Sequence, residues 1–174
     1  PSGKYEFVNR TLADAGLDPL PAYYEPFTSP RSTPERAKKY PLTLISGARR
    51  PEYFLSEHRQ SPSLRRMHPN PTATIHAEDA KKYGIADGDW IWVENDHGRI
   101  RMQAEVTLSI KPNVVNVDNG WWFPERDPED GTYFGTFESN ANVLMTLQNG
   151  MTGMGCTIKA ELCRIYKAGE DGES

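Results

Sequence analysis

One segment of the chain shows a strict alternation that fits a strand with one buried face. In residues 98–109, apolar side chains occupy every second position and Arg, Gln, Glu or Thr fill the positions between them. Successive side chains of a strand point to opposite faces, so this pattern predicts a half-buried strand. The turn sequence NDHG joins it to the apolar run at residues 90–93, which predicts a β-hairpin. The alternating apolar residues are Ile100, Met102, Ala104, Val106 and Leu108.

Other parts of the chain contain short apolar runs bounded by turn residues, and few segments favour a helix. AEDAKKYG at residues 77–84 is typical of a short helix, with acids first, lysines last and Gly84 as its end. SPSLRRMHP at residues 61–69 predicts one or two helical turns. Together these patterns predict a mainly β protein with short helices, folded as a closed or nearly closed barrel of six or seven strands. The further strands are expected in PLTLISG (41–47), VVNV (114–117), ANVLM (141–145) and CRIYK (163–167).

The first 40 residues differ from the rest of the chain. Prolines at positions 19, 21, 26, 30 and 34 exclude a regular helix in residues 18–36. We therefore expect residues 1–40 to be a Pro-rich extension or linker from a preceding domain, residues 41–168 to form the barrel, and residues 169–174 to be an acidic tail. The chain also starts without Met, which indicates a piece of a longer polypeptide.

Composition and charge argue against several classes of protein. The formal net charge is -4, whereas nucleic-acid-binding domains are usually basic, so we expect no nucleic acid partner. No apolar run approaches the ~18 residues that a membrane span needs. Cys156 and Cys163 are the only cysteines, and their spacing matches no zinc motif. The four His are scattered, so we expect no metal ligand in this chain.

The segment ISGARRPEYFLSEHRQ at residues 45–60 concentrates cations in an acidic protein. Ser46 and Gly47 allow a ligand to approach the backbone closely, and Arg49 and Arg59 offer planar donors that suit phosphate. The alternative is a set of surface ion pairs with the neighbouring glutamates, worth at most ~1 kcal/mol each. Arg50 is expected at the surface.

Two later segments also carry candidate ligand-binding side chains. In ESNANVL, Asn140 and Asn142 stand two apart, so in an extended segment both face the same way and could bind the edge of a ring system. The alternative is a plain turn. In GWWFP, Trp121 and Trp122 could line a cleft, although at least one of them is expected in the core.

The order of these segments resembles a known family. HPNPTATIHAEDAKKYGIADGDWIWVENDHGRIRMQAEVT, preceded by ISGAR and SEHRQ and followed by GWWFPE, ESNANVL and LCRIYKA, is similar to the carboxy-terminal domain of molybdopterin oxidoreductases of the dimethyl sulfoxide reductase superfamily. That resemblance implies a double-psi β-barrel of the aspartate-decarboxylase type that binds molybdopterin guanine dinucleotide. The cofactor-binding residues it implies are Ser46, Gly47, Arg49, Ser56, His58, Arg59, Trp121, Asn140 and Asn142.

The resemblance also implies partners and a division of labour. In the family, molybdenum or tungsten is held by the cofactor and by a ligand in an earlier domain, so we expect no catalytic residue and no complete active site here. The expected partners are the preceding domains of the same polypeptide and an iron–sulfur electron-transfer subunit. The location is open between the cytoplasm and, with a twin-arginine signal upstream, export.

Two other readings stand beside this one. A pyruvoyl-dependent decarboxylase of the same barrel class cleaves itself at a Gly-Ser bond, and the sequence has no Gly-Ser dipeptide. A free-standing barrel that serves only as a protein-interaction module remains the alternative, because the aromatic extension and the acidic stretch around PERDPEDG would suit an interface.

Overall fold

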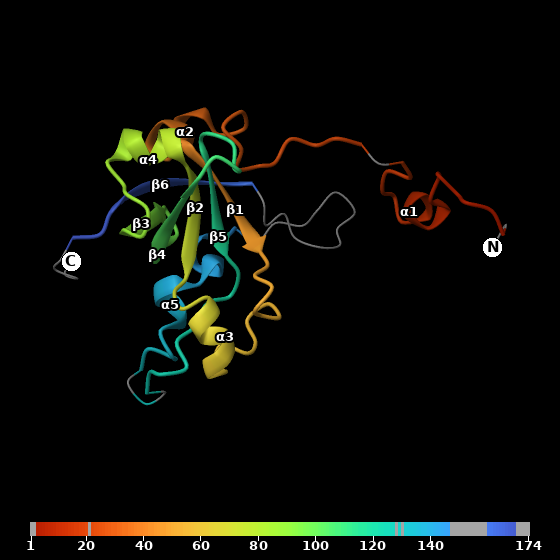
Figure 1. Cartoon of the computed structure of the whole chain (residues 1–174). Helices are drawn as coiled ribbons and strands as arrows, with labels where there is room; N and C mark the ends of the chain where they lie inside the picture. Colours follow the sequence, from red (N-terminus) through yellow and green to blue (C-terminus); the bar gives the residue numbers. More distant parts are fainter. Residues whose placement is uncertain (1–2, 21, 128, 130, 147–159, 170–174) are drawn as a thin grey trace.

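The computed structural model describes residues 3–20, 22–127, 129, 131–146 and 160–169. Within this part, six strands close into one barrel in the order β1-β5-β2-β4-β3-β6 (Figure 1). The predicted mainly β class with few short helices is confirmed. The strands are β1 (Leu42–Ala48), β2 (Thr72–His76), β3 (Trp90–Asn95), β4 (Gly98–Thr107), β5 (Val114–Asp118) and β6 (Glu161–Lys167).

The barrel combines parallel and antiparallel neighbours. Strand β1 runs parallel to β5, and β2 runs parallel to β4, while the other neighbours are antiparallel. Parallel neighbours cannot be joined by a tight hairpin, so the chain must cross an end of the barrel to connect them. Among the six described strands, only β3 and β4, at the predicted NDHG turn, are consecutive in sequence and also paired. Two parallel pairs with crossing connections are what the expected double-psi barrel requires.

The barrel interior forms the main core, and the alternation in β4 holds along most of that strand. Ile100, Met102 and Ala104 are buried, and they pack with residues of the other five strands. Val106 is only partly buried, and Leu108 is 78% exposed. The prediction that Leu108 faces the core is wrong. The strand ends at Thr107, so Leu108 is not part of the sheet and its side chain does not follow the alternation between the two faces.

All helices of the described residues are short, and apart from α1 they lie at the two ends of the barrel (Figure 1). They are α1 (Arg10–Asp14), α2 (Pro34–Lys39), α3 (Pro62–Met67), α4 (Ala77–Tyr83), α5 (Thr136–Ser139) and the 3-10 helix η2 (Ala141–Leu144). Figure 1 shows α2 and α4 at one end of the barrel and α3 and α5 at the other. Helix α4 ends as predicted at Gly84, whose φ of 65° is left-handed and suits a residue without Cβ.

Two sequence predictions need correction. ANVLM is not a strand: residues 141–144 form η2, and the Asn140 side chain begins it by accepting a hydrogen bond from the Asn142 backbone N–H at 3.0 Å. That cap outweighs the strand preference of a short apolar run. Pro34 does not prevent a helix but begins α2, because proline is tolerated in the first helical turn.

The end of the extension is attached to the barrel. Arg36 in α2 pairs with buried Glu161 of β6 and with Asp96 in the β3–β4 turn, the latter at 2.6 Å. The Thr28 hydroxyl donates to the carbonyl of Ala160. Farther towards the amino terminus, α1 stands away from the barrel (Figure 1). The extension is therefore anchored from about Thr28 onwards.

Aromatic side chains of the extension are exposed at Tyr5, Phe7, Tyr23, Tyr24 and Phe27. Among the described residues, no helix has the length and apolar character needed to cross a bilayer.

Candidate cofactor site

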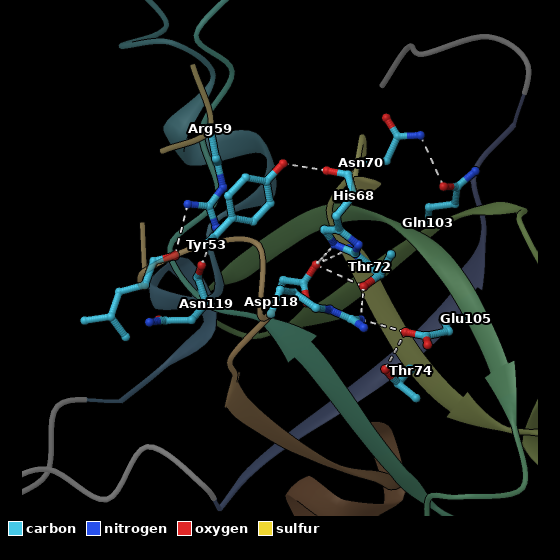
Figure 2. Close-up of polar contacts among 12 residues, drawn as sticks. Tyr53, Arg59, His68, Asn70, Thr72, Thr74, Gln103, Glu105, Asp118 and Asn119 are labelled. Atoms are coloured by element: carbon cyan, nitrogen blue, oxygen red, sulfur yellow. Dashed lines mark hydrogen bonds and ion pairs between the residues drawn. The ribbon is translucent and has the colours of Figure 1, made fainter. Parts of the chain in front are cut away.

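The loops at the α3 and α5 end of the barrel are organised around one buried carboxylate. Asp118 ends β5 and is 1% exposed. Its oxygens accept hydrogen bonds from Arg50 Nε at 2.8 Å, from His68 Nε2 at 2.8 Å, and from both the backbone N–H and the hydroxyl of Thr72 at 2.9 Å. Figure 2 shows His68 and Thr72 turned towards Asp118. The carboxylate thus joins the first and last parts of the segment between β1 and β2.

Arg50 belongs to this network rather than to the surface. Its side chain is 23% exposed and pairs with Glu105 of β4 at 2.6 Å as well as with Asp118. It also donates to the Thr72 hydroxyl. Burial would lower the pKa of Arg50, but hydrogen bonds to Glu105 and Asp118 outweigh burial and raise it. The expectation of a surface Arg50 is wrong because two carboxylates from distant strands meet it.

Arg59 is held between two aromatic rings. Its guanidinium carbon lies 4.9 Å from the centre of the Tyr53 ring and 4.6 Å from that of Trp121. It donates to the carbonyl of Leu55 at 3.1 Å and to that of Asn119 at 2.9 Å (Figure 2). Burial lowers the pKa of Arg59. The guanidinium therefore ties the loop after β1 to the loop after β5.

The backbone of the first loop adopts an unusual conformation over residues 55–58. Leu55 and His58 have φ of 55° and 69°, a left-handed conformation that costs a non-Gly residue ~1–2 kcal/mol. The carbonyl of Ser56 accepts a hydrogen bond from Trp122 Nε1 at 2.6 Å. A Cβ added to Gly120 would lie 3.0 Å from that of Ser56, so the two loops approach as closely as a glycine allows.

The predicted site residues of the first loop divide into exposed and buried ones. Arg49, Ser56 and His58 are exposed. Arg49 forms no ion pair or hydrogen bond with any residue that the structure describes. Arg59 is 2% exposed. Gly47, with φ of 97°, lies at a β-bulge where the pairing of β1 with β5 shifts register. Ser46 just before it is buried.

The other predicted residues lie at the same end of the barrel. Trp121 is fully buried with Tyr53 and Phe123, so it packs beneath the loops. This agrees with the expectation that at least one of Trp121 and Trp122 lies in the core. Asn142 is exposed on η2, and Asn140 is half-buried and caps that helix. Because the segment is helical, the two side chains do not project in parallel. Neither forms a hydrogen bond with residues 49–59 in the described part of the chain.

Sequence patterns missed the residues that organise this end. Asp118, Tyr53, Glu105 and His68 were not predicted as site residues. The Tyr53 hydroxyl donates to the His68 carbonyl at 2.6 Å. One signal was available: an acidic residue closing the apolar run VVNVD must be paired if it is buried.

Asp118 should make the free energy of unfolding depend on pH in the acidic range. Burial would raise the pKa of Asp118, but the hydrogen bond from His68 and the charge of Arg50 outweigh burial and lower it. Its contribution to stability is therefore present above the ordinary pKa of ~3.9 and is lost as pH falls through the lowered value. Urea unfolding followed from pH 7 to pH 2 should show a fall in stability below about pH 4. The fall should be shallower in Asp118→Asn; equal slopes would contradict this assignment.

A metal bound directly by protein side chains has no candidate site in the described residues, where no three His, Cys, Asp or Glu side chains cluster. Cys163 is a buried free thiol whose pKa is raised by burial. Cys156 lies outside the described residues. The site thus offers guanidinium, amide, hydroxyl and imidazole donors, a set that suits phosphate and heterocyclic carbonyl groups.

A closed barrel whose end carries a braced loop with outward-facing donors defines a ligand-binding domain. The family described as "Molydopterin dinucleotide binding domain" matches residues 42–163. The chain therefore belongs to this molybdopterin dinucleotide-binding family, of the dimethyl sulfoxide reductase superfamily that the sequence resembled. The alternative of an interaction module without cofactor is not favoured.

Several characterised proteins are similar to this chain. A dopamine dehydroxylase of Eggerthella lenta is 40% identical over 152 residues, covering 86% of this chain and 14% of the relative. The acetylene hydratase of Syntrophotalea acetylenica is 37% identical, covering 83% of this chain and 20% of the relative. The solved acetylene hydratase from Pelobacter acetylenicus superposes with a TM-score of 0.83 at 33% identity, covering 97% of this chain and 24% of that one. The chain thus spans about a fifth or less of the curated relatives' length.

Proposed function

We propose that this chain clamps molybdopterin guanine dinucleotide for a larger molybdenum or tungsten oxidoreductase, and that Arg49 contacts the dinucleotide directly. The observation that carries this proposal is the contrast between two adjacent arginines. Arg50 is paired with two carboxylates, whereas Arg49 is exposed and unpaired within the described chain. An exposed guanidinium beside a bulge at Gly47 can reach a phosphate with two parallel donors.

The other donors have distinct parts in this proposal. Ser56 and His58 are exposed on the braced loop, and Asn142 is exposed on η2 at the same end of the barrel. Their hydroxyl, imidazole and amide groups suit pterin and guanine edges. Arg59 and Trp121 are buried, so they support the loop from below, and Ser46 and Gly47 shape the bulge. When bound, the cofactor would supply the redox chemistry, and this chain would hold and orient it.

The expected partners follow from the size of the relatives. Because the relatives are five to seven times longer than the matched part, the cofactor would be shared with other domains of the same polypeptide. The exposed rings of Tyr23 and Phe27 on the extension suit packing against those domains. An iron–sulfur electron-transfer subunit belongs to this proposal as a further partner, and substrate and reaction would depend on residues outside this chain.

Arg49→Ala should weaken the binding of guanosine 5′-monophosphate, the nucleotide half of the cofactor, about tenfold, or ~1.4 kcal/mol. The binding would be measured by calorimetric titration. Arg66→Ala is the matched control, because Arg66 is an exposed arginine of α3 at the same end of the barrel. Equal binding by both variants would contradict the role of Arg49.

The wider proposal is tested on the native polypeptide. Isolated from its source, it should carry molybdenum or tungsten and should release guanine nucleotide on acid hydrolysis. A native polypeptide that contains neither the metal nor the nucleotide would overturn the cofactor function and would leave the interaction module as the better account.

A further inference from the structure

Asp118 holds both ends of the loop on which the proposed ligand contacts lie. Of its donors, Arg50 comes two residues after β1, whereas His68 and Thr72 come just before and at the start of β2. The exposed residues Ser56 and His58 fall between these attachment points. A single carboxylate thus closes a segment of about twenty residues into a ring of contacts at the barrel end.

The middle of the same segment is attached to this ring. The Tyr53 hydroxyl donates to the carbonyl of His68 at 2.6 Å, and the Tyr53 ring lies 6.1 Å from the His68 ring. Tyr53 in turn stacks on Arg59, whose guanidinium holds the Leu55 and Asn119 carbonyls. Figure 2 shows these side chains as one continuous group running from Asp118 to Arg59.

The loop needs such bracing because part of its backbone is strained. Leu55 and His58 are both left-handed, and residues in sparsely populated conformations persist only when the surrounding structure determines them. Without the attachments at Arg50 and His68, the loop would relax to other conformations, and a ligand would have to restore the bound one at a cost in affinity.

We propose that Asp118 is the positioning residue that holds the 49–59 loop in its ligand-binding conformation before the ligand arrives. It touches no ligand itself: it is buried, and it acts through Arg50, His68 and Thr72. The inference rests on the proposed function for the identity of the ligand, but the ordering of the loop is a property of this chain alone.

The test compares two buried carboxylates. Asp118→Asn keeps the shape of the side chain and removes the charge that Arg50 faces. Asp79→Asn is the matched control, because Asp79 is also buried, accepts the Asn113 backbone N–H at 2.6 Å, and lies in α4 at the opposite end of the barrel (Figure 1). Both changes should lower stability, and only the first should loosen the loop.

Hydrogen exchange of the full chain without ligand is the first readout. In Asp118→Asn, the amides of residues 53–60 should exchange at least tenfold faster, while those of β3 and β6, which do not contact Asp118, keep their rates; Asp79→Asn should leave the loop unchanged. Unaltered loop exchange in Asp118→Asn would overturn the inference. If Asp118→Asn does not fold, Tyr53→Phe, which removes only the hydroxyl bonded to His68, should speed loop exchange at least threefold, and an unchanged rate would again overturn it.

Binding of guanosine 5′-monophosphate is the second readout. Asp118→Asn should bind it at least fivefold more weakly than Asp79→Asn does. If the wild-type chain binds no nucleotide and the native polypeptide carries no cofactor, the proposed function is wrong. The hydrogen-exchange result would still decide whether Asp118 orders the loop. Wild-type binding that Asp118→Asn retains in full would defeat the positioning role alone.

Discussion

Replacing Trp121 by Ala should lower the free energy of unfolding by about 3–5 kcal/mol. The Trp121 side chain is fully buried and meets Tyr53, His68 and Phe123 edge to face, with ring centres 5.6–6.4 Å apart. Removing an indole from such a cluster loses its transfer free energy and leaves a cavity. Urea denaturation followed by circular dichroism would measure the change.

Trp121→Phe provides the matched comparison. The indole Nε1 is buried and has no hydrogen-bond partner among the described residues, so Phe would remove an unsatisfied donor along with part of the ring. The cost should therefore be less than half that of Trp121→Ala. A Trp121→Ala variant within about 1 kcal/mol of the wild type would show that this cluster contributes little to stability. It would then be a poor support for the loop above it.

Local sequence patterns predicted the barrel strands well, because buried and exposed side chains alternate along a strand. The alternation at Ile100, Met102 and Ala104 reports the inward face of β4 directly. The end of α4 at Gly84 was also predictable, since one residue determines it. The run ANVLM was misassigned because a stretch this short fits either a strand or a helical turn, and the Asn140 cap decides between them.

The candidate site could be predicted only in part, because its organisation depends on residues far apart in the sequence. The segment 45–60 drew attention by its charge, but its charges alone could not show that Arg50 meets Asp118 and Glu105 while Arg49 has no such partner among the described residues. Those contacts span 68 and 55 positions and require the barrel to close. The resemblance to a known family supplied the ligand, and the fold then distinguished the exposed side chains of the segment from the buried ones.

Replacing Arg36 by Met should cost about 3 kcal/mol of stability, the low end of the range for breaking a buried ion pair. Glu161 is 3% exposed, and its oxygens are shared between Arg36, the Thr146 hydroxyl at 2.6 Å, and backbone N–H groups. Without the guanidinium, the carboxylate remains buried with hydroxyl and amide donors only. Since the Arg36 side chain is 16% exposed, some water can reach the space that the guanidinium leaves beside Glu161. This hydration keeps the loss of stability near the low end of the range for buried ion pairs.

Two further variants separate the buried charge from a general effect of losing a cation in α2. Lys38→Met removes a cation of the same helix whose partner Glu35 is 82% exposed, so the loss should stay within ~0.5 kcal/mol. Adding Glu161→Gln to Arg36→Met removes the uncompensated charge and should recover part of the lost stability, as measured by urea denaturation of all four proteins. If the double variant is no more stable than Arg36→Met, the cost lies in lost packing of α2 on β6. The extension would then be anchored by packing of the methylene groups of Arg36 rather than by its charge.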